Sequence, residues 1–304
     1  MNSKLSPCND IIMTALEAGI DALAITQITP VASTAIARYN KWIENGYNAG
    51  MDYLTRYPEI RFDPSGLLPG ASSIICCAIS YNHISHQPPG VPRIASYAHG
   101  DDYHEVVREI LEKLASYVRE TFGGETRVCV DTAPIMERYW ALHSGLAFRG
   151  RSGLMIIPDL GTYFFLGEII TTAPLPSFRN TDVDQCMQCN KCRSSCPGQA
   201  ILPDGTIDAR KCLSYLTIEH RGELPAGLST GGRLYGCDEC QRVCPHNRHI
   251  TSTRQTRFLM RKTYETLTAD SIERMTQEEF SLIFRHSAIK RAKLSGLKRN
   301  AQHL

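Results

Sequence analysis

Four cysteines within eleven residues constrain this chain more than any other feature of its sequence. Cys186, Cys189, Cys192 and Cys196 follow the spacing C-x-x-C-x-x-C-x-x-x-C, and Pro197 comes directly after the last thiol. A short loop with this spacing wraps a [4Fe–4S] cluster, and the proline turns the chain away from the fourth ligand. Electron transfer is therefore the first role that the sequence indicates.

A second set of cysteines repeats the ending of the first. Four more thiols follow at Cys212, Cys237, Cys240 and Cys244, and Pro245 follows the last of them. Eight thiols suit two [4Fe–4S] clusters, and in proteins with two such clusters the fourth cysteine of each run ligates the other cluster. We therefore assign Cys186, Cys189, Cys192 and Cys244 to one cluster, and Cys196, Cys212, Cys237 and Cys240 to the second.

Structural zinc is the alternative for such cysteines, because zinc sites are also built from C-x-x-C pairs. Zinc sites rarely place four cysteines in one short run or repeat the Cys-Pro ending, so the spacing favours iron–sulfur clusters. Disulfides are disfavoured, because dense C-x-x-C spacing without a secretory leader is typical of metal ligation in a reducing compartment.

The length and the termini suggest a cytoplasmic chain with no membrane association. At 304 residues the chain suffices for two domains, or for one large domain with an appendage. Its first residues lack a basic region followed by an apolar stretch, and no apolar run approaches membrane-spanning length. No G-x-G-x-x-G or G-x-x-x-x-G-K-[ST] motif occurs, which disfavours a Rossmann dinucleotide site or a P-loop.

Charge is unevenly distributed along the chain. The net charge is only +2, but residues 251–304 carry eleven Lys or Arg against five Asp or Glu. From Arg285 onward there are six basic residues and no acidic one, a pattern that suits a phosphate backbone. A solvated helix face near a terminus explains the same charges equally well.

Hydrophobic periodicity predicts an α/β domain before the cysteines. We expect helices over residues 10–18 and 30–45, a long amphipathic helix through Val106 and Val118 that ends at Gly123, and a helix from Pro134. We expect strands over 21–25, 72–79 and 127–131, and a hairpin of 150–157 with 162–171. Pro174 and Pro176 mark a linker. The expected divisions are a domain at 1–175, a two-cluster domain at 176–250, and a basic helical tail at 251–304 with a capping box at Thr276 and Glu279.

Asp131 is a candidate catalytic acid because of its position. It ends the predicted strand over residues 127–131. In α/β sheets ligands bind beyond the carboxyl ends of the strands, which is where a catalytic carboxyl would stand. Capping of the following helix explains Asp131 equally well.

The order of these motifs resembles the epoxyqueuosine reductases, a bacterial family of cobalamin- and iron–sulfur-dependent tRNA-modifying enzymes related to reductive dehalogenases. The resemblance covers nearly the whole chain. It runs through residues 46–56, 61–64, 97–104, 130–134 and 163–168, both cysteine runs, 212–219, and 290–300.

The resemblance implies reduction of the epoxide of epoxyqueuosine, at the wobble position of tRNA, to queuosine. It implies an α/β (α+β) cobalamin-binding domain with a mixed sheet flanked by helices, joined to a ferredoxin-like domain. Electrons would pass through the two clusters to base-off cobalamin. An external low-potential donor of the ferredoxin or flavodoxin type would supply the electrons. The enzyme would be a monomer.

The resemblance also implies roles for single residues. Asp131 would be the proton donor, and burial is expected to keep its carboxyl protonated near neutral pH. Contacts to the corrin are expected from Tyr97, Asp131, Met155, Ile156, Ile157, Gly167, Ser214, Cys237 and Asp238. Contacts to tRNA are expected from His220, Arg221, Lys290, Arg291, Lys298 and Arg299.

Two departures from the family's pattern bear on these expectations. The usual Gly-Lys-Asn segment is Gly150-Arg151-Ser152 here, and longer members continue past the Arg299-Asn300 position into a helical-repeat domain. The basic tail is therefore expected to help hold RNA, whose splayed bases proteins read by stacking and edge contacts. A reductive dehalogenase-like enzyme acting on a small molecule, or a polyferredoxin-type electron carrier, are the alternatives.

Overall fold

A four-stranded antiparallel sheet organises the first half of the protein. The computed structural model describes residues 7–83, 87–180, 186–187 and 189–304. The strand order is β1 (Ala22–Gln27), β2 (Ser73–Ser80), β7 (Phe164–Thr171) and β4 (Thr126–Cys129). The register of the two central strands places Ser73 opposite Thr171 and Ser80 opposite Phe164.

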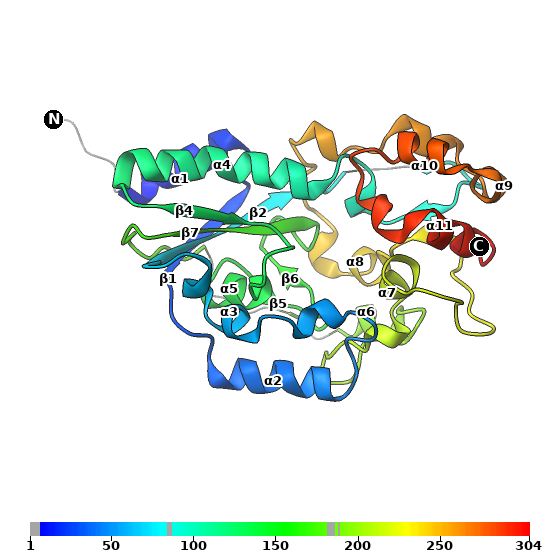
Figure 1. The fold of residues 1–304 in the computed structure, drawn as a ribbon, viewed down its shortest axis with the longest axis horizontal. Helices are drawn as coiled ribbons and strands as arrows, with labels where there is room; N and C mark the ends of the chain where they lie inside the picture. Colours follow the sequence, from blue (N-terminus) through cyan, green and yellow to red (C-terminus); the bar gives the residue numbers. More distant parts are fainter. Residues whose placement is uncertain (1–6, 84–86, 181–185, 188) are drawn as a thin grey trace.

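Helices lie on both faces of this sheet, as Figure 1 shows, and apolar side chains pack between them and the strands. Ile75, Cys77 and Ile79 of β2 pack in the layer of α1 (Pro7–Ala18) and α4 (Tyr103–Phe122). The alternate residues, Ile74 and Cys76 among them, pack in the layer that contains α5 (Glu137–His143) and the start of α2 (Ser33–Glu44). Burial on both faces explains why β2 is a continuous apolar run rather than an alternating one.

Helix α4 forms where its sequence predicts. The Asp102 side chain accepts a hydrogen bond from the backbone N–H of His104, which caps the first turn. Val107, Leu111 and Leu114 repeat at helical spacing on the buried face. Gly123 ends the helix with a φ of 74°, a conformation that glycine adopts without strain.

The second half packs beside the sheet rather than on it (Figure 1). β3 (Arg93–Ile94) pairs in parallel with β8 (Arg233–Tyr235), and this pairing joins the two halves. A separate apolar core contains Tyr264, Phe284 and Leu297 of the second half, together with residues of the first half. The remaining helices here are α6 (Lys191–Ser194), α7 (Leu213–Ile218), α8 (Glu239–Arg242), α9 (Ala269–Arg274), α10 (Gln277–Ile283) and α11 (Lys293–Ala301).

The expected fold class, a sheet flanked by helices beside a cluster-binding segment, is confirmed. Parallel and antiparallel pairing are both present among the described strands, but in different sheets. The capping box of Thr276 and Glu279 is confirmed at the start of α10. The boundaries expected at residues 175 and 250 stay a prediction. None of the helices in the described ranges combines the length and apolarity that crossing a membrane requires.

The expected hairpin of residues 150–157 with 162–171 is wrong. β6 (Met155–Ile156) pairs with β5 (Phe148–Arg149) instead, because a turn that Gly153 closes with a φ of 75° reverses the chain earlier. β7 takes the centre of the main sheet, where its apolar side chains are buried. Helices α2 and α5 begin three residues later than Pro30 and Pro134 suggest, after short irregular segments. Helix α3 (Pro58–Phe62) lies under the same face as α5.

Candidate active site

A cavity of about 1980 Å³ lies between the main sheet and the cysteine segment. Its walls come from residues 39–61, 95–105, 131–139, 152–166, 196–221, 235–241 and 285–293. Sites for drug-sized ligands usually measure about 300–1,000 Å³. This cavity therefore has room for a large cofactor together with part of a substrate.

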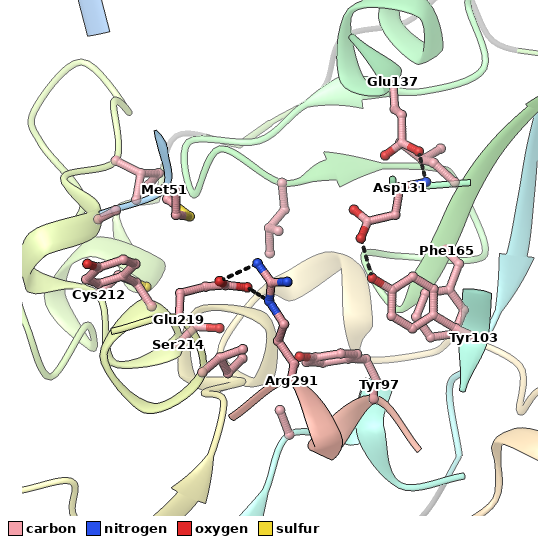
Figure 2. Close-up of a pocket in the computed structure, with 18 of the residues that line it drawn as sticks. Met51, Tyr97, Tyr103, Asp131, Glu137, Phe165, Cys212, Ser214, Glu219 and Arg291 are labelled. Atoms are coloured by element: carbon pink, nitrogen blue, oxygen red, sulfur yellow. Dashed lines mark hydrogen bonds and ion pairs between the residues drawn. The ribbon is translucent and has the colours of Figure 1, made fainter. Parts of the chain in front are cut away.

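Asp131 lines this cavity at the centre of a hydrogen-bonded group (Figure 2). Its Oδ2 accepts a hydrogen bond from the Tyr103 hydroxyl at 2.8 Å and lies 2.9 Å from His104 Nε2. His104 Nδ1 lies 2.6 Å from Asp102 Oδ1. Asp131 itself has a φ of 52°, so its backbone is in the left-handed region that few residues other than glycine adopt. Tyr103 and His104 come from the first turn of α4, which aims them at the end of β4.

The protonation of this group differs from the expectation. Enclosure raises the pKa of Asp131, but hydrogen bonds from His104 and Tyr103 outweigh it, and the pKa is lowered. For His104, burial lowers the pKa, while the bonds to Asp102 and Asp131 raise it to about 9. The expectation that burial keeps Asp131 protonated is therefore wrong for this conformation. At neutral pH the proton of the pair resides on His104.

Glu137 holds the Asp131 backbone in place from the other side. The Asp131 N–H donates to Glu137 Oε1 at 2.6 Å, as Figure 2 shows. Burial, and then the charge of Asp131, raise the pKa of Glu137 to about 7. Sequence reasoning missed Glu137, because an acidic residue in the first turn of a helix is ordinarily read as a complement to the helix dipole.

An ion pair stands on the wall opposite Asp131 (Figure 2). The Arg291 guanidinium donates to both carboxylate oxygens of Glu219, at 2.8 and 2.7 Å. The same guanidinium lies 5.5 Å from the centroid of the Tyr53 ring. Sequence reasoning missed Glu219 and Tyr53 as partners of Arg291, because their contacts are formed only in the fold.

The residues expected to contact tRNA divide into two groups. Arg221, Lys290 and Arg291 line the cavity. His220, Lys298 and Arg299 are not among its described lining residues. The Arg299 guanidinium donates to the backbone carbonyls of Leu216, His220 and Gly222, an arrangement that fastens α11 to α7.

The eight cysteines of the two runs form two separate groups. Cys196, Cys212, Cys237 and Cys240 line the large cavity. Cys186, Cys189, Cys192 and Cys244 line a small cavity beside residues 150–152. Burial raises the pKa of each of Cys192 and Cys240, and within each group the neighbouring thiolates raise it further. The grouping agrees with the assignment made from the spacing, while ligation itself stays a prediction.

The residues expected to contact a corrin are only partly brought together. Tyr97, Met155, Ser214, Cys237 and Asp238 line the large cavity with Asp131, whereas Ile156 lines the small one. Ile157 and Gly167 are not among the described lining residues of either. A Cβ on Gly167 would lie 2.6 Å from Leu111 Cδ1, so this glycine lets α4 pack closely on the sheet.

Comparisons with known proteins agree with this architecture. A family model described as "Epoxyqueuosine reductase QueG, DUF1730" matches residues 61–132, and one described as "4Fe-4S double cluster binding domain" matches residues 185–247. The chain is 36% identical to an epoxyqueuosine reductase of Cyclobacterium marinum over 94% of this chain and 93% of that protein. It is 33% identical to one of Cellulophaga algicola, with 100% of both chains covered.

A solved structure matches nearly the whole length of this chain. It is described as a crystal structure of epoxyqueuosine reductase with a tRNA-Tyr epoxyqueuosine-modified tRNA stem loop. The TM-score is 0.89 and the identity 28%, over 97% of this chain and 79% of that one. The likeness includes both the sheet and the cysteine segment.

Proposed function

We propose, for a chain that belongs to the epoxyqueuosine reductase family, that it reduces the epoxide of epoxyqueuosine at the wobble position of tRNA to the alkene of queuosine. It is an oxidoreductase with a double [4Fe–4S] cluster segment. One observation carries the finer proposal. The Asp131 group and the thiols of Cys196, Cys212, Cys237 and Cys240 face the same large cavity. A bare electron carrier needs no such cavity.

The cavity fits a cobalamin, the cofactor that we propose for it. Its volume of about 1980 Å³ exceeds what a nucleoside alone requires, and its wall combines aromatic, aliphatic and hydrogen-bonding side chains. Tyr97, Met155, Ser214 and Asp238 would hold the cofactor, in its base-off form. When bound, cobalamin supplies a low-potential cobalt that passes electrons to the epoxide carbon.

The two thiol groups define the direction of electron flow that we propose. Cys189 is exposed, and its group lies at the small cavity, away from Asp131. The other group opens on the large cavity. Electrons from an external low-potential donor of the ferredoxin or flavodoxin type would enter at the Cys186, Cys189, Cys192 and Cys244 group. They would leave from the Cys196, Cys212, Cys237 and Cys240 group.

The protons have a separate route in this proposal. His104 carries the proton at neutral pH, and its Nε2 lies 2.9 Å from Asp131 Oδ2 at the wall of the cavity that both residues line. Asp131 would accept this proton and pass it to the oxygen of the opening epoxide, a poor leaving group without protonation. Asp102 would orient His104 through its hydrogen bond to Nδ1.

RNA binding is proposed for the basic residues at the cavity. Arg221, Lys290 and Arg291 would contact the backbone of the anticodon loop while the wobble base enters. Arg299 would support α11 rather than touch RNA, because it is not among the described lining residues of the cavity and its guanidinium is bonded to backbone carbonyls. Contacts to phosphate would make binding weaken as salt increases. We also propose a monomeric, cytoplasmic enzyme with no membrane association.

The proposal is tested by incubating the reduced, cofactor-loaded enzyme with an anticodon stem-loop that contains epoxyqueuosine. Mass spectrometry of the nucleosides then measures conversion to queuosine. We expect Asp131→Asn to retain iron and cobalamin but to lose about 10²–10⁴-fold in rate, the usual worth of general acid catalysis.

Asp270→Asn is the matched control, because the Asp270 side chain is 76% exposed on α9. No conversion by the loaded wild-type enzyme would contradict the proposed function. Undiminished conversion by Asp131→Asn would show that Asp131 is not the proton donor, without contradicting the proposed function.

A further inference from the structure

Arg61 is a buried cation at the large cavity with no carboxylate to neutralise it among the described residues. It lies in α3, lines the cavity and is only 9% exposed. Its Nε is buried without a hydrogen-bond partner in the described part of the chain. Those residues offer the guanidinium one acceptor, the Tyr53 carbonyl at 3.5 Å from Nη2, which is longer than an ordinary hydrogen bond. No described carboxylate forms an ion pair with it.

The chemistry of a guanidinium determines what could neutralise Arg61. An arginine is always charged in proteins, and its five N–H donors form a planar fork. A buried charge without a partner destabilises the fold, and an anion that enters the cavity would remove this cost. Phosphates and carboxylates match the fork with two parallel hydrogen bonds. Arg61 is therefore placed to bind an anionic group inside the cavity.

Aromatic and aliphatic side chains continue from Arg61 along the wall of the cavity. The guanidinium carbon of Arg61 lies 5.9 Å from the centroid of the Tyr39 ring, and the Tyr39 and Trp42 ring centroids are 6.2 Å apart. Trp42 Nε1 donates to the carbonyl of Ile207 at 2.7 Å, and Ile207 forms a β-bridge with Ile201. All five residues line the cavity. This sequence of a cation, two aromatic rings and an aliphatic surface suits a phosphate that is joined to a flat aromatic base.

We propose that Arg61 binds the phosphodiester in the nucleotide tail of cobalamin, and that Trp42 and Ile207 line the space for the benzimidazole of that tail. The inference rests on the cobalamin of the proposed function. In the base-off form the benzimidazole has left the cobalt, so the tail needs a binding site of its own. Outside the corrin–cobalt core the phosphodiester is the only ionised group of cobalamin, because the other corrin side chains are neutral amides.

The RNA backbone also consists of phosphodiesters, but burial favours the cofactor. The three cavity residues proposed to contact RNA, Arg221, Lys290 and Arg291, are exposed. Arg61 is buried. A buried guanidinium suits a cofactor tail that the protein encloses, whereas the backbone of a folded stem-loop stays at the mouth of the cavity.

The test measures the binding of two corrinoids to protein that carries its iron–sulfur clusters but no cobalamin, under anaerobic conditions. Cob(II)inamide lacks the phosphate, ribose and benzimidazole that cob(II)alamin has. We expect Arg61→Met to weaken cob(II)alamin binding about 10–100-fold, the usual worth of a hydrogen bond to a charged group, and to leave cob(II)inamide binding unchanged. Arg61→Lys, which keeps the charge but not the planar fork, should lose less.

The ratio of the two dissociation constants is the readout. Cobalamin also has to release its base from cobalt, and the substitution at Arg61 leaves that cost unchanged. Arg274→Met on α9 is the matched control, because the Arg274 side chain is 77% exposed, and we expect the wild-type ratio. Thermal unfolding checks that the variants fold. If Arg61→Met does not fold, Arg61→Lys provides the ratio.

Three outcomes would contradict these assignments. An equal loss for both corrinoids, or no loss for either, would overturn the tail site. Weaker binding of the epoxyqueuosine stem-loop with unchanged cob(II)alamin binding would assign Arg61 to the RNA backbone and overturn it as well. If the wild type bound neither corrinoid, the cobalamin of the proposed function would itself be contradicted.

Discussion

At the scale of residues, the site depends on pairings between side chains that are distant in the sequence. Cysteine spacing is a local property, so the sequence predicts the two thiol groups and the placement of Asp131. It does not predict that Tyr103 and His104 meet Asp131, because residues 27 or 28 positions apart meet only through the tertiary fold. The protonation of Asp131 cannot be predicted from the sequence for the same reason, since its hydrogen-bond partners determine the direction of its pKa shift.

The raised pKa of His104 predicts how stability depends on pH. Burial lowers this pKa, but the bonds to Asp102 and Asp131 raise it from 6.5 to about 9. The folded state therefore binds the proton more tightly than the unfolded chain. Its contribution to stability is complete below about pH 6.5 and is lost as the pH rises through about 9.

Thermal unfolding of wild type and of His104→Gln should reveal this contribution. We expect the wild type to be more stable by about 1 kcal/mol or less at pH 6, because the pair is partly exposed, and the difference to vanish above pH 9.5. A difference that grows with pH would show that His104 is neutral in the folded protein.

At the scale of elements, periodicity identifies the helices and strands but not their neighbours. α1, α4, β1 and β2 lie close to their predicted positions. The argument that placed Asp131 beyond a strand end comes from parallel sheets, whereas β4 and β7 are antiparallel. Asp131 reaches the cavity nonetheless, because the chain leaves β4 at Cys129 and turns with a left-handed residue.

The contact between α4 and β7 makes a specific prediction at Gly167. An added Cβ would lie 2.6 Å from Leu111 Cδ1 and 3.2 Å from Val107 Cγ1. We expect Gly167→Ala to destabilise the protein by about 1–3 kcal/mol through overpacking. Thermal or denaturant unfolding measures the change. Gly296→Ala in α11 is the control, because its Cβ would have an ordinary contact at 3.6 Å. Equal stability of the two variants would contradict this packing role of Gly167.

At the scale of the whole molecule, the crossed assignment of cysteines links the two runs into one unit. Cys196 belongs to the first run by sequence but lines the large cavity with Cys237 and Cys240. Cys244 ends the second run but lines the small cavity with Cys192. Neither cluster could then form from one run alone.

Cysteine variants test this assignment. Wild-type protein should contain about eight iron atoms, and a variant that loses one cluster about four. We expect Cys196→Ser to leave the same cluster behind as Cys240→Ser, and a different one from Cys192→Ser. Iron analysis with electron paramagnetic resonance of the reduced proteins distinguishes the two remaining clusters. If Cys196→Ser instead matches Cys192→Ser, each run ligates its own cluster.

The parallel pairing of β3 with β8 has a consequence for how the protein is made. The main sheet is complete once Thr171 has been synthesised, but Ile94 pairs with Tyr235, and the backbone N–H of Asp102 bonds to the carbonyl of His286. At about 5–20 residues per second, roughly ten seconds pass on the ribosome between the synthesis of Thr171 and that of His286. Cys244, the last of the eight cysteines, precedes His286, so all eight thiols are synthesised before the carbonyl that accepts the Asp102 N–H. Cluster insertion thus has a time window before the reactive pocket closes around it.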